Sequence, residues 1–209
     1  MKLNDETLRF IHEHCKDDVR NLALQAPKYP GVDMPVALTQ IAGRQAAAEK
    51  IPSWYAEEGI LYPRHLSLEQ CSSEATARYK ASIIPEFSSG TLADLTGGFG
   101  IDCAFLSPKF HHVTYVERQE VLCEIASHNF PLLALNHIRV ENKDAIRHLQ
   151  EMSSADWIFI DPARRDGHGG KTVAIADCEP NVAELESLLH ENSQHLKVKI
   201  STMLDMSLA

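Results

Sequence analysis

The sequence predicts an α/β protein in which a small helical domain precedes a parallel sheet of about five strands. Two observations predict this class. Before residue 90, apolar residues recur at intervals of three or four, which is the spacing of a helix. After residue 90, short apolar runs alternate with helical stretches, which is typical of a parallel sheet covered by helices on both faces. We therefore expect a helical domain over 1–88 and an α/β core over 89–209.

The helical domain should begin with a helix of about twenty residues, because Asn4 can cap its start and apolar residues follow at helical spacing. A proline-rich connector over 26–35 comes next. Pro35 fits the first turn of a second helix that ends at about Lys50. A third helix is expected over 73–84.

The core should contain strands over 91–94, 113–117, 138–140, 156–161 and 196–201. The helices expected between them cover 101–106, 119–130, 145–152 and 179–194. In sheets of this kind, ligands bind beyond the carboxyl ends of the strands. The residues that follow each strand are therefore the first candidates for a site.

The composition limits the function classes. A chain of 209 residues with 44% hydrophobic and 23% charged residues can form one full domain and a smaller one. Its net charge of −9 argues against nonspecific electrostatic binding of nucleic acid over the whole surface. A local basic patch is compatible with that charge. We find no apolar run of membrane length and no secretory signal, so we expect no membrane contact and a cytoplasmic location. The five cysteines are scattered, and no metal is expected.

The most informative motif is the turn DLTGGFG over 94–100, which lies between a strand and a helix. Its glycines let the backbone approach a ligand, and the free N–H groups of the following helix favour anionic or electron-rich groups. Asp94 at its entrance would repel a dinucleotide pyrophosphate but suits a cofactor with a cationic amino-acid end. S-adenosylmethionine (SAM) is such a cofactor.

Acidic residues fall at the carboxyl ends of four successive strands, at Asp94, Glu117, Asp144 and Asp161. Each one alone could be a helix cap or a turn residue. Together they predict a ligand-binding rim. Glu117 lies about twenty residues beyond the glycine turn, where a carboxylate can accept bonds from ribose hydroxyls. Asp144 can accept from an adenine amino group, Asp94 from an ammonium group, and Asp161 borders the substrate space.

Over about residues 66–201, the chain resembles the class I SAM-dependent methyltransferases. Their first motif is similar to D-x-T-x-G-x-G at 94–100, with Thr96 in place of the first glycine. The resemblance implies a Rossmann-like sheet, incomplete here, and SAM as the cofactor. It assigns Glu117 to ribose, Asp144 to adenine and Asp161 to the fourth motif.

More narrowly, the chain is similar to bacterial methyltransferase-like proteins whose full-length members carry a THUMP-like domain after the catalytic core. The likeness is carried by QIAGRQ at 40–45, QCSSEATA at 70–77, the glycine turn, DPARR at 161–165 and KIS at 199–201. The segment 70–77 lies where related enzymes close over the methionine end of the cofactor.

These motifs yield a set of expected site residues. The expected cofactor-binding residues are Gln70, Ser73, Thr76, Asp94, Thr96, Gly97, Gly98, Phe99, Gly100, Asp102, Glu117, Arg118, Asp144, Ala145 and Asp161. Asp161 and Arg164 are the expected catalytic residues. Arg164 and Arg165 are expected to bind the acceptor, because guanidinium pairs with phosphate in bidentate fashion. RNA is the favoured acceptor, since THUMP domains in related proteins engage RNA.

The chain departs from the wider class in two ways. Amino-directed nucleic-acid methyltransferases place a proline and an aromatic residue where Ala163 and Arg164 stand, which disfavours base N-methylation. Enzymes that make 5-methyluridine are closer in this motif, but their cysteine nucleophile has no counterpart at 201–202. The class normally has seven strands, so we expect a piece of a longer protein; the alternative is a sheet completed by another chain.

Two other functions remain open. An NAD-dependent oxidoreductase would use the same strand, turn and helix, but the G-x-G-x-x-G spacing is missing. A catalytically inactive SAM-binding or RNA-binding module would keep the site without the reaction. Methyl transfer to any acceptor would exclude this second alternative.

Overall fold

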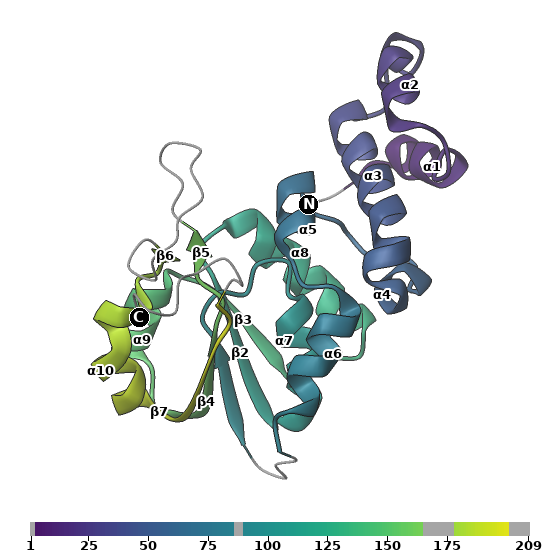
Figure 1. Ribbon diagram of the computed structural model, residues 1–209. Helices are drawn as coiled ribbons and strands as arrows, with labels where there is room; N and C mark the ends of the chain where they lie inside the picture. The colour runs from purple at the N-terminus through teal and green to yellow at the C-terminus, as the bar shows by residue number, and fades with distance from the viewer. Residues whose placement is uncertain (1–2, 86–89, 165–177, 201–209) are drawn as a thin grey trace.

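The computed structural model describes residues 3–85, 90–164 and 178–200, and Figure 1 shows their arrangement. The α-helices are α1 (Asp5–Glu13), α2 (Val19–Leu24), α3 (Met34–Lys50), α4 (Pro52–Ala56), α5 (His65–Gln70), α6 (Glu74–Ser82), α7 (Ile101–Leu106), α8 (Glu120–Leu132), α9 (Ala145–Glu151) and α10 (Val182–Asn192). Two short 3-10 helices are η1 (Ala26–Lys28) and η2 (Ser107–Lys109). The strands are β1 (Thr91–Asp94), β2 (His112–Glu117), β3 (Ile138–Asn142), β4 (Ala155–Ile160), β5 (Ala163–Arg164), β6 (Cys178–Glu179) and β7 (Ser193–Val198).

Five strands form one parallel sheet in the order β3-β2-β1-β4-β7. The strand order reverses between β1 and β4, and such a reversal opens a crevice outside the carboxyl ends. This sheet, with its helices, confirms the predicted Rossmann-like α/β class. The five predicted strand positions are confirmed to within a few residues.

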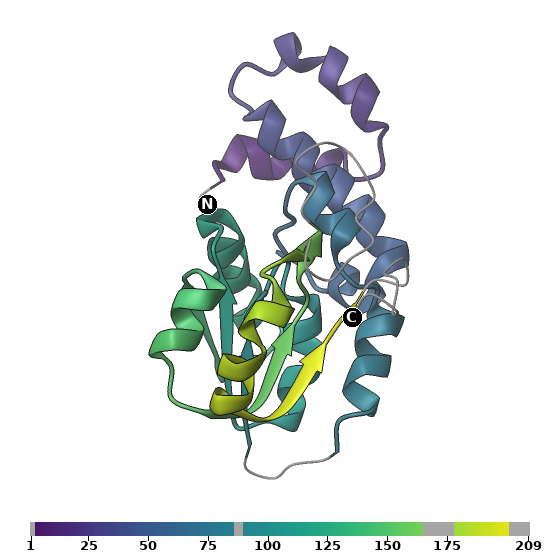
Figure 2. The ribbon, with the colours of Figure 1, turned by 60° about the vertical axis from the view of Figure 1, so that its left-hand side comes forward.

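Helices cover both faces of the sheet, as Figures 1 and 2 show together. The helices α6, α7 and α8 lie on one face, and α9 and α10 lie on the other. Fully buried side chains such as Tyr115, Phe130 and Phe159 fill the first layer. Ile158 and Leu189 belong to the second. Burial of apolar surface between the sheet and these helices contributes about 25 cal/mol per Å² to stability. It fixes the positions of the strands and therefore of the residues at their carboxyl ends.

The predicted first helix of about twenty residues is wrong, because the structure has two helices there. The helix α1 ends at Glu13, and α2 begins after Asp18, whose side chain accepts from the N–H of Asn21 at 2.9 Å. That cap favours a new helix start over a continuous helix. The structure also contains α4 and α5, two short helices that periodicity did not predict.

A two-stranded antiparallel ribbon, β5 with β6, was also not predicted. It pairs Ala163 with Glu179 and Arg164 with Cys178. The helix expected from residue 179 therefore begins later, at Val182, where the side chain of Asn181 accepts from the N–H of Ala183.

The segment at residues 61 and 62 is held between two helices by side-chain amides. Asn129 of α8 accepts from the N–H of Leu61 and donates to its carbonyl, both at 2.9 Å. Gln40 of α3 does the same for Tyr62, at 2.8 and 2.9 Å. These buried amides satisfy backbone groups that no strand or helix would satisfy. They join the helical segment to the α/β core, whose hydrophobic cluster also includes Trp54 and residues from both sides of position 88.

Among the described residues, no helix combines the length and the apolar character needed to cross a membrane.

Candidate active site

The carboxyl ends of β1, β2 and β4 bring Asp94, Glu117 and Asp161 to the same edge of the sheet. Asp144 follows β3 at that edge and begins α9. Parallel strands in register make this clustering unavoidable, because all their ends point the same way. The rim expected from the sequence is therefore present as an arrangement of carboxylates.

The glycine turn is built on Tyr115. A Cβ at Gly97 would lie 2.1 Å from the Tyr115 ring, so this position has no room for a side chain. Gly98 and Gly100 have φ angles of 55° and 89°, which favour glycine. A Cβ at Gly98 would meet nothing closer than the carbonyl oxygen of Thr96 at 3.8 Å. Gly97 therefore serves packing, whereas a Cβ at Gly98 would make only an ordinary van der Waals contact.

Glu117 is hydrogen-bonded to the turn opposite it. Its Oε2 accepts from the N–H of Gly98 at 2.9 Å, and its Oε1 accepts from the N–H of Gln119 at 2.8 Å. The hydroxyl of Tyr115 donates to the carbonyl of Gly98 at 2.6 Å. The carboxylate is therefore oriented before any ligand arrives, and each oxygen keeps a further acceptor position. The Gly98 N–H, which the sequence suggested for the ligand, is occupied by Glu117.

Asp94 carries a polar atom without a protein partner. Its side chain is 1% exposed, Oδ1 accepts from the N–H of Thr96 at 3.1 Å, and Oδ2 has no hydrogen-bond partner. Burial raises the pKa of Asp94 well above its usual value, and the negative charges of Asp102, Asp161 and Glu117 raise it further. A cationic group placed at Oδ2 would offset both effects.

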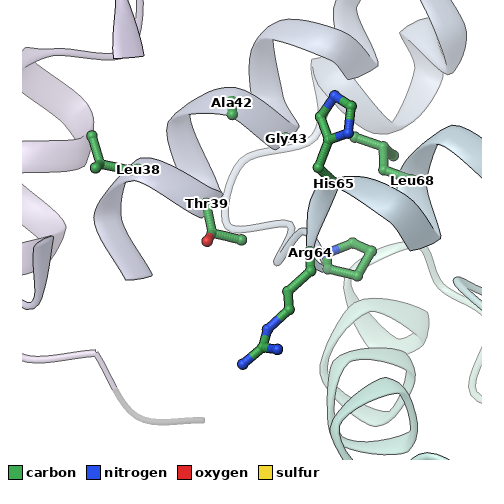
Figure 3. Close-up of a pocket in the computed structure, with 8 residues that line it drawn as sticks. Leu38, Thr39, Ala42, Gly43, Arg64, His65 and Leu68 are labelled. Atoms are coloured by element: carbon green, nitrogen blue, oxygen red, sulfur yellow. The ribbon is translucent and has the colours of Figure 1, made fainter. Parts of the chain in front are cut away.

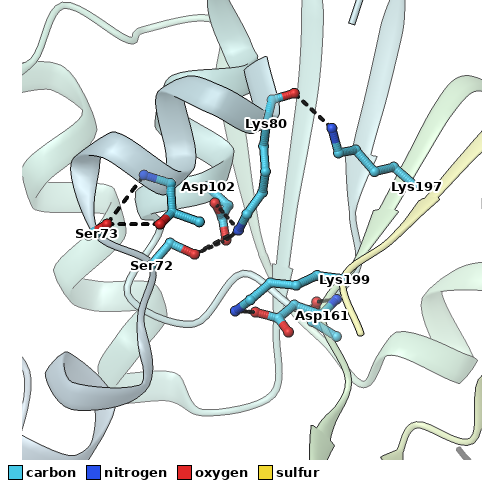
Figure 4. A network of polar contacts seen from close by, with 9 residues as sticks. Ser72, Ser73, Lys80, Asp102, Asp161, Lys197 and Lys199 are labelled. Atoms are coloured by element: carbon cyan, nitrogen blue, oxygen red, sulfur yellow. Dashed lines mark hydrogen bonds and ion pairs between the residues drawn. The ribbon is translucent and has the colours of Figure 1, made fainter. Parts of the chain in front are cut away.

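Asp102, expected to contact the cofactor, is paired inside the protein (Figure 4). Lys80 of α6 lies 2.6 Å from its Oδ1, and the hydroxyl of Ser72 donates to its Oδ2 at 2.8 Å. Both charged side chains are about nine-tenths buried, with 9% and 11% exposed. The pair joins the segment before the first strand to the helix after the glycine turn.

The other expected residues of segment 70–77 lie at helix ends. The Ser73 hydroxyl caps α6 by accepting from the N–H of Thr76 at 3.2 Å, and the two hydroxyls lie 2.9 Å apart. Gln70 is exposed at the end of α5. Phe99 is 2% exposed and packs against Trp54, with ring centroids 5.0 Å apart. Its side chain therefore belongs to the core.

At the β3 end of the rim, Asp144 caps a helix. Its Oδ1 accepts from the N–H groups of Ile146 and Arg147 at 2.9 and 3.1 Å, while the residue remains exposed. Ala145 is the first residue of α9. Arg118 forms an ion pair with Glu179 of β6 at 2.7 Å.

Two exposed apolar residues at nearby helix starts were not singled out from the sequence. Val121 and Ile146 lie in the first turns of α8 and α9, with 60% and 38% of their surfaces exposed. The sequence contains a pattern that could have indicated both residues, because each is an apolar residue in the first helical turn after a rim carboxylate.

Asp161 is bound on two sides. Its N–H donates to the hydroxyl of Thr96 at 2.6 Å, and its Oδ2 is bonded to Lys199 (Figure 4). Burial raises the pKa of Asp161, and Lys199 opposes that rise. Arg164 lies in β5, and Arg165 lies outside the described residues.

A separate pocket of about 230 Å³ lies between α3 and α5 (Figure 3). It is lined by Leu38, Thr39, Ala42, Gly43, Pro63, Arg64, His65 and Leu68. None of the expected site residues lines this pocket, so the pocket and the rim are two separate places on the protein. Within the described ranges, no group of three His, Cys, Asp or Glu side chains is placed to hold a metal.

Comparison with known proteins supports the fold. The crystal structure of a candidate methyltransferase from Porphyromonas gingivalis W83 superposes with a TM-score of 0.78 and 29% identity, covering 98% of this chain. Precorrin-8w decarboxylase from Methanobacterium thermoautotrophicum superposes with a TM-score of 0.50 at 13% identity, covering 63% of this chain and 66% of its own. No family model and no curated protein matches the sequence.

The structure therefore has a Rossmann-like methyltransferase fold. The chain spans about half the length of the Porphyromonas gingivalis protein, since it covers 51% of that chain.

Proposed function

We propose that this protein binds SAM at the rim of its sheet and transfers the methyl group to an acceptor. The observation that carries the proposal is the buried Asp94, whose Oδ2 has no partner and which enters the same turn as Gly98, where a Cβ would meet no atom closer than 3.8 Å. A ligand with a positive charge and a polar, extended shape fits both features. SAM carries an ammonium and a sulfonium group.

Different rim residues would bind different parts of SAM. Glu117, already oriented by backbone bonds, would accept from the ribose hydroxyls. Val121 and Ile146 would flank the adenine ring, and Asp144 would accept from its amino group through the oxygen not used in capping α9. Asp94 would bind the ammonium end, with the segment 70–77 beside it.

When bound, SAM supplies a methyl group that is already activated by its sulfonium. The protein's main task is then to orient an acceptor, and proximity and orientation provide most of the rate enhancement. Asp161 would accept the proton that the acceptor loses. Its position after β4, bonded to both Thr96 and Lys199, supports that role.

RNA is the acceptor we favour. The support is the resemblance to proteins with a THUMP-like domain, together with Arg164 and Arg165, whose guanidinium groups would bind phosphate. We also propose that the natural protein continues beyond this chain, as the longer Porphyromonas gingivalis structure suggests. A cytoplasmic location stays a prediction.

Calorimetry with SAM, S-adenosylhomocysteine and NAD tests the binding. We expect SAM to bind with a Kd in the low to middle micromolar range, about −7 to −8 kcal/mol. Asp94→Asn should weaken binding, whereas Asp156→Asn should not, because Asp156 binds Thr91 at the start of β1 and β4. Clear binding of NAD with no heat from SAM would contradict the proposal.

Incubation of the protein with methyl-labelled SAM and total cellular RNA, and then with small molecules, tests the transfer. A labelled product from RNA is the expected result. Binding of SAM with no labelled product from any acceptor would favour the inactive binding module.

A further inference from the structure

The arrangement of Lys199 and Asp161 follows from the pairing of two strands. The strands β4 and β7 are parallel, with Ile160 opposite Val198, and the N–H of Lys199 donates to the carbonyl of Ile160 at 2.9 Å. The residues that follow each strand are therefore neighbours. Lys199 reaches Asp161 Oδ2 from this position, as Figure 4 shows.

The backbone of Asp161 is fixed as well. Its N–H donates to the Thr96 hydroxyl, and the N–H of Thr96 donates to Asp94. A glycine at position 96, the residue usual in the first motif, has no hydroxyl for this bond. Asp161 is thus connected to the cofactor turn through its backbone and to β7 through its side chain.

The charges around Asp161 come from four elements. Asp94 at the end of β1 and Asp102 of α7 are negative neighbours, and Lys80 of α6 and Lys199 are positive ones. Lys80 already forms a close ion pair with Asp102. Lys199 is the cation bonded directly to Asp161, which is 29% exposed at its side chain.

We propose that Lys199 is a positioning residue that keeps Asp161 ionised and aligned to take a proton from an N–H or O–H acceptor. This inference rests on the proposed function. Burial favours the protonated form of Asp161, in which it could not accept a proton, and the bond from Lys199 favours the charged form. The rim therefore suits a neutral nucleophile that must lose a proton.

The first test is an NMR titration of the Asp161 carboxyl carbon, assigned with Asp161→Asn, in the full chain. We expect Lys199→Met and Lys199→Gln to raise its midpoint by about one pH unit or more, because a bonded cation is removed. Lys199→Arg should restore the parent value. Lys197→Met is the matched control, since Lys197 lies on the same strand and donates to the carbonyl of Lys80.

The second test is the pH profile of methyl transfer from labelled SAM to total RNA. The acid limb should move to higher pH in Lys199→Met and return in Lys199→Arg, while the affinity for SAM changes less than about twofold. An unchanged Asp161 midpoint in both neutral variants would overturn the role of Lys199. Failure of the parent to bind SAM or label any product would instead contradict the proposed function, and the titration separates these two outcomes.

Discussion

Lys80 of α6 and Asp102 of α7 form a buried ion pair, with Nζ 2.6 Å from Oδ1. Lys80 also lies 5.5 Å from the centroid of the Phe159 ring. The pair therefore connects α6, the helix before the first strand, to α7, the helix after the glycine turn.

Lys80→Met should lower the free energy of unfolding by about 3 to 5 kcal/mol, because it leaves a buried carboxylate without its cation. Urea denaturation measures the change. The double variant Lys80→Met/Asp102→Leu should recover most of the loss, since no unpaired charge remains. Lys143→Met is a suitable control, because its ion pair with the exposed Glu151 should contribute little to stability. An equal loss in the double variant would show that the charges themselves are not the cause.

Asp94→Asn should stabilise the ligand-free protein at neutral pH and weaken SAM binding. Burial raises the pKa of Asp94, so the folded state binds a proton more strongly than the unfolded state. Stability from this group is thus full at low pH and is lost as the pH rises. The variant should gain about 1 kcal/mol at pH 7, the scale of one unmet hydrogen bond, and the gain should shrink as the pH falls through the raised pKa of Asp94 towards the usual carboxyl range. Denaturation curves at several pH values check this; a gain that grows in acid would contradict it.

Glu117→Ala should weaken SAM binding by about 1.5 to 3 kcal/mol, the range for hydrogen bonds to a charged group. The structure adds an effect that the sequence did not suggest. Loss of the bonds to Gly98 and Gln119 should also lower the stability of the ligand-free protein, by about 1 to 3 kcal/mol. Calorimetry and thermal melting separate the two effects. Full SAM affinity in a folded variant would limit Glu117 to a structural role.

Alanine at Gly97 should mainly lower stability, whereas alanine at Gly98 should mainly weaken SAM binding. Gly97→Ala places a Cβ against the Tyr115 ring and should destabilise the fold by about 3 kcal/mol. Gly98→Ala meets no atom closer than 3.8 Å and should cost only the strain of its φ of 55°, about 1 to 2 kcal/mol. Its methyl group would occupy the ligand space, so SAM binding should fall by about tenfold or more in a stable protein. Unchanged SAM binding in Gly98→Ala would remove this space from the site.

The sequence predicted the sheet well because its signals are local. Alternating short apolar runs set the strand positions, and acidic residues after each run indicated the rim. Local signals failed where contacts between distant segments determine the local structure. The ribbon at Ala163 depends on a pairing partner, Glu179, that lies further along the chain, whereas the break before Asp18 comes from a local cap that helical periodicity does not detect.

The candidate site shows the same limit. Asp94 and Glu117 could be located from their spacing, but their bonding partners could not. The pairing of Asp102 with Lys80 spans 22 residues, and that of Asp161 with Lys199 spans 38. Such pairs depend on how strands and helices are arranged in space, which periodicity does not report. Asp144 is the reverse case, since its helix-capping bond is entirely local.

The two amides at Asn129 and Gln40 give residues 61 and 62 the hydrogen bonding of a strand, although the segment has no strand beside it. A change to either amide alone would leave two buried backbone groups without partners. The sequences of the helical segment and of the α/β core therefore cannot change independently at this junction. A chimera that exchanges the N-terminal helices with those of a related protein would have to keep Gln40, Asn129 and residues 61 and 62 from the same parent.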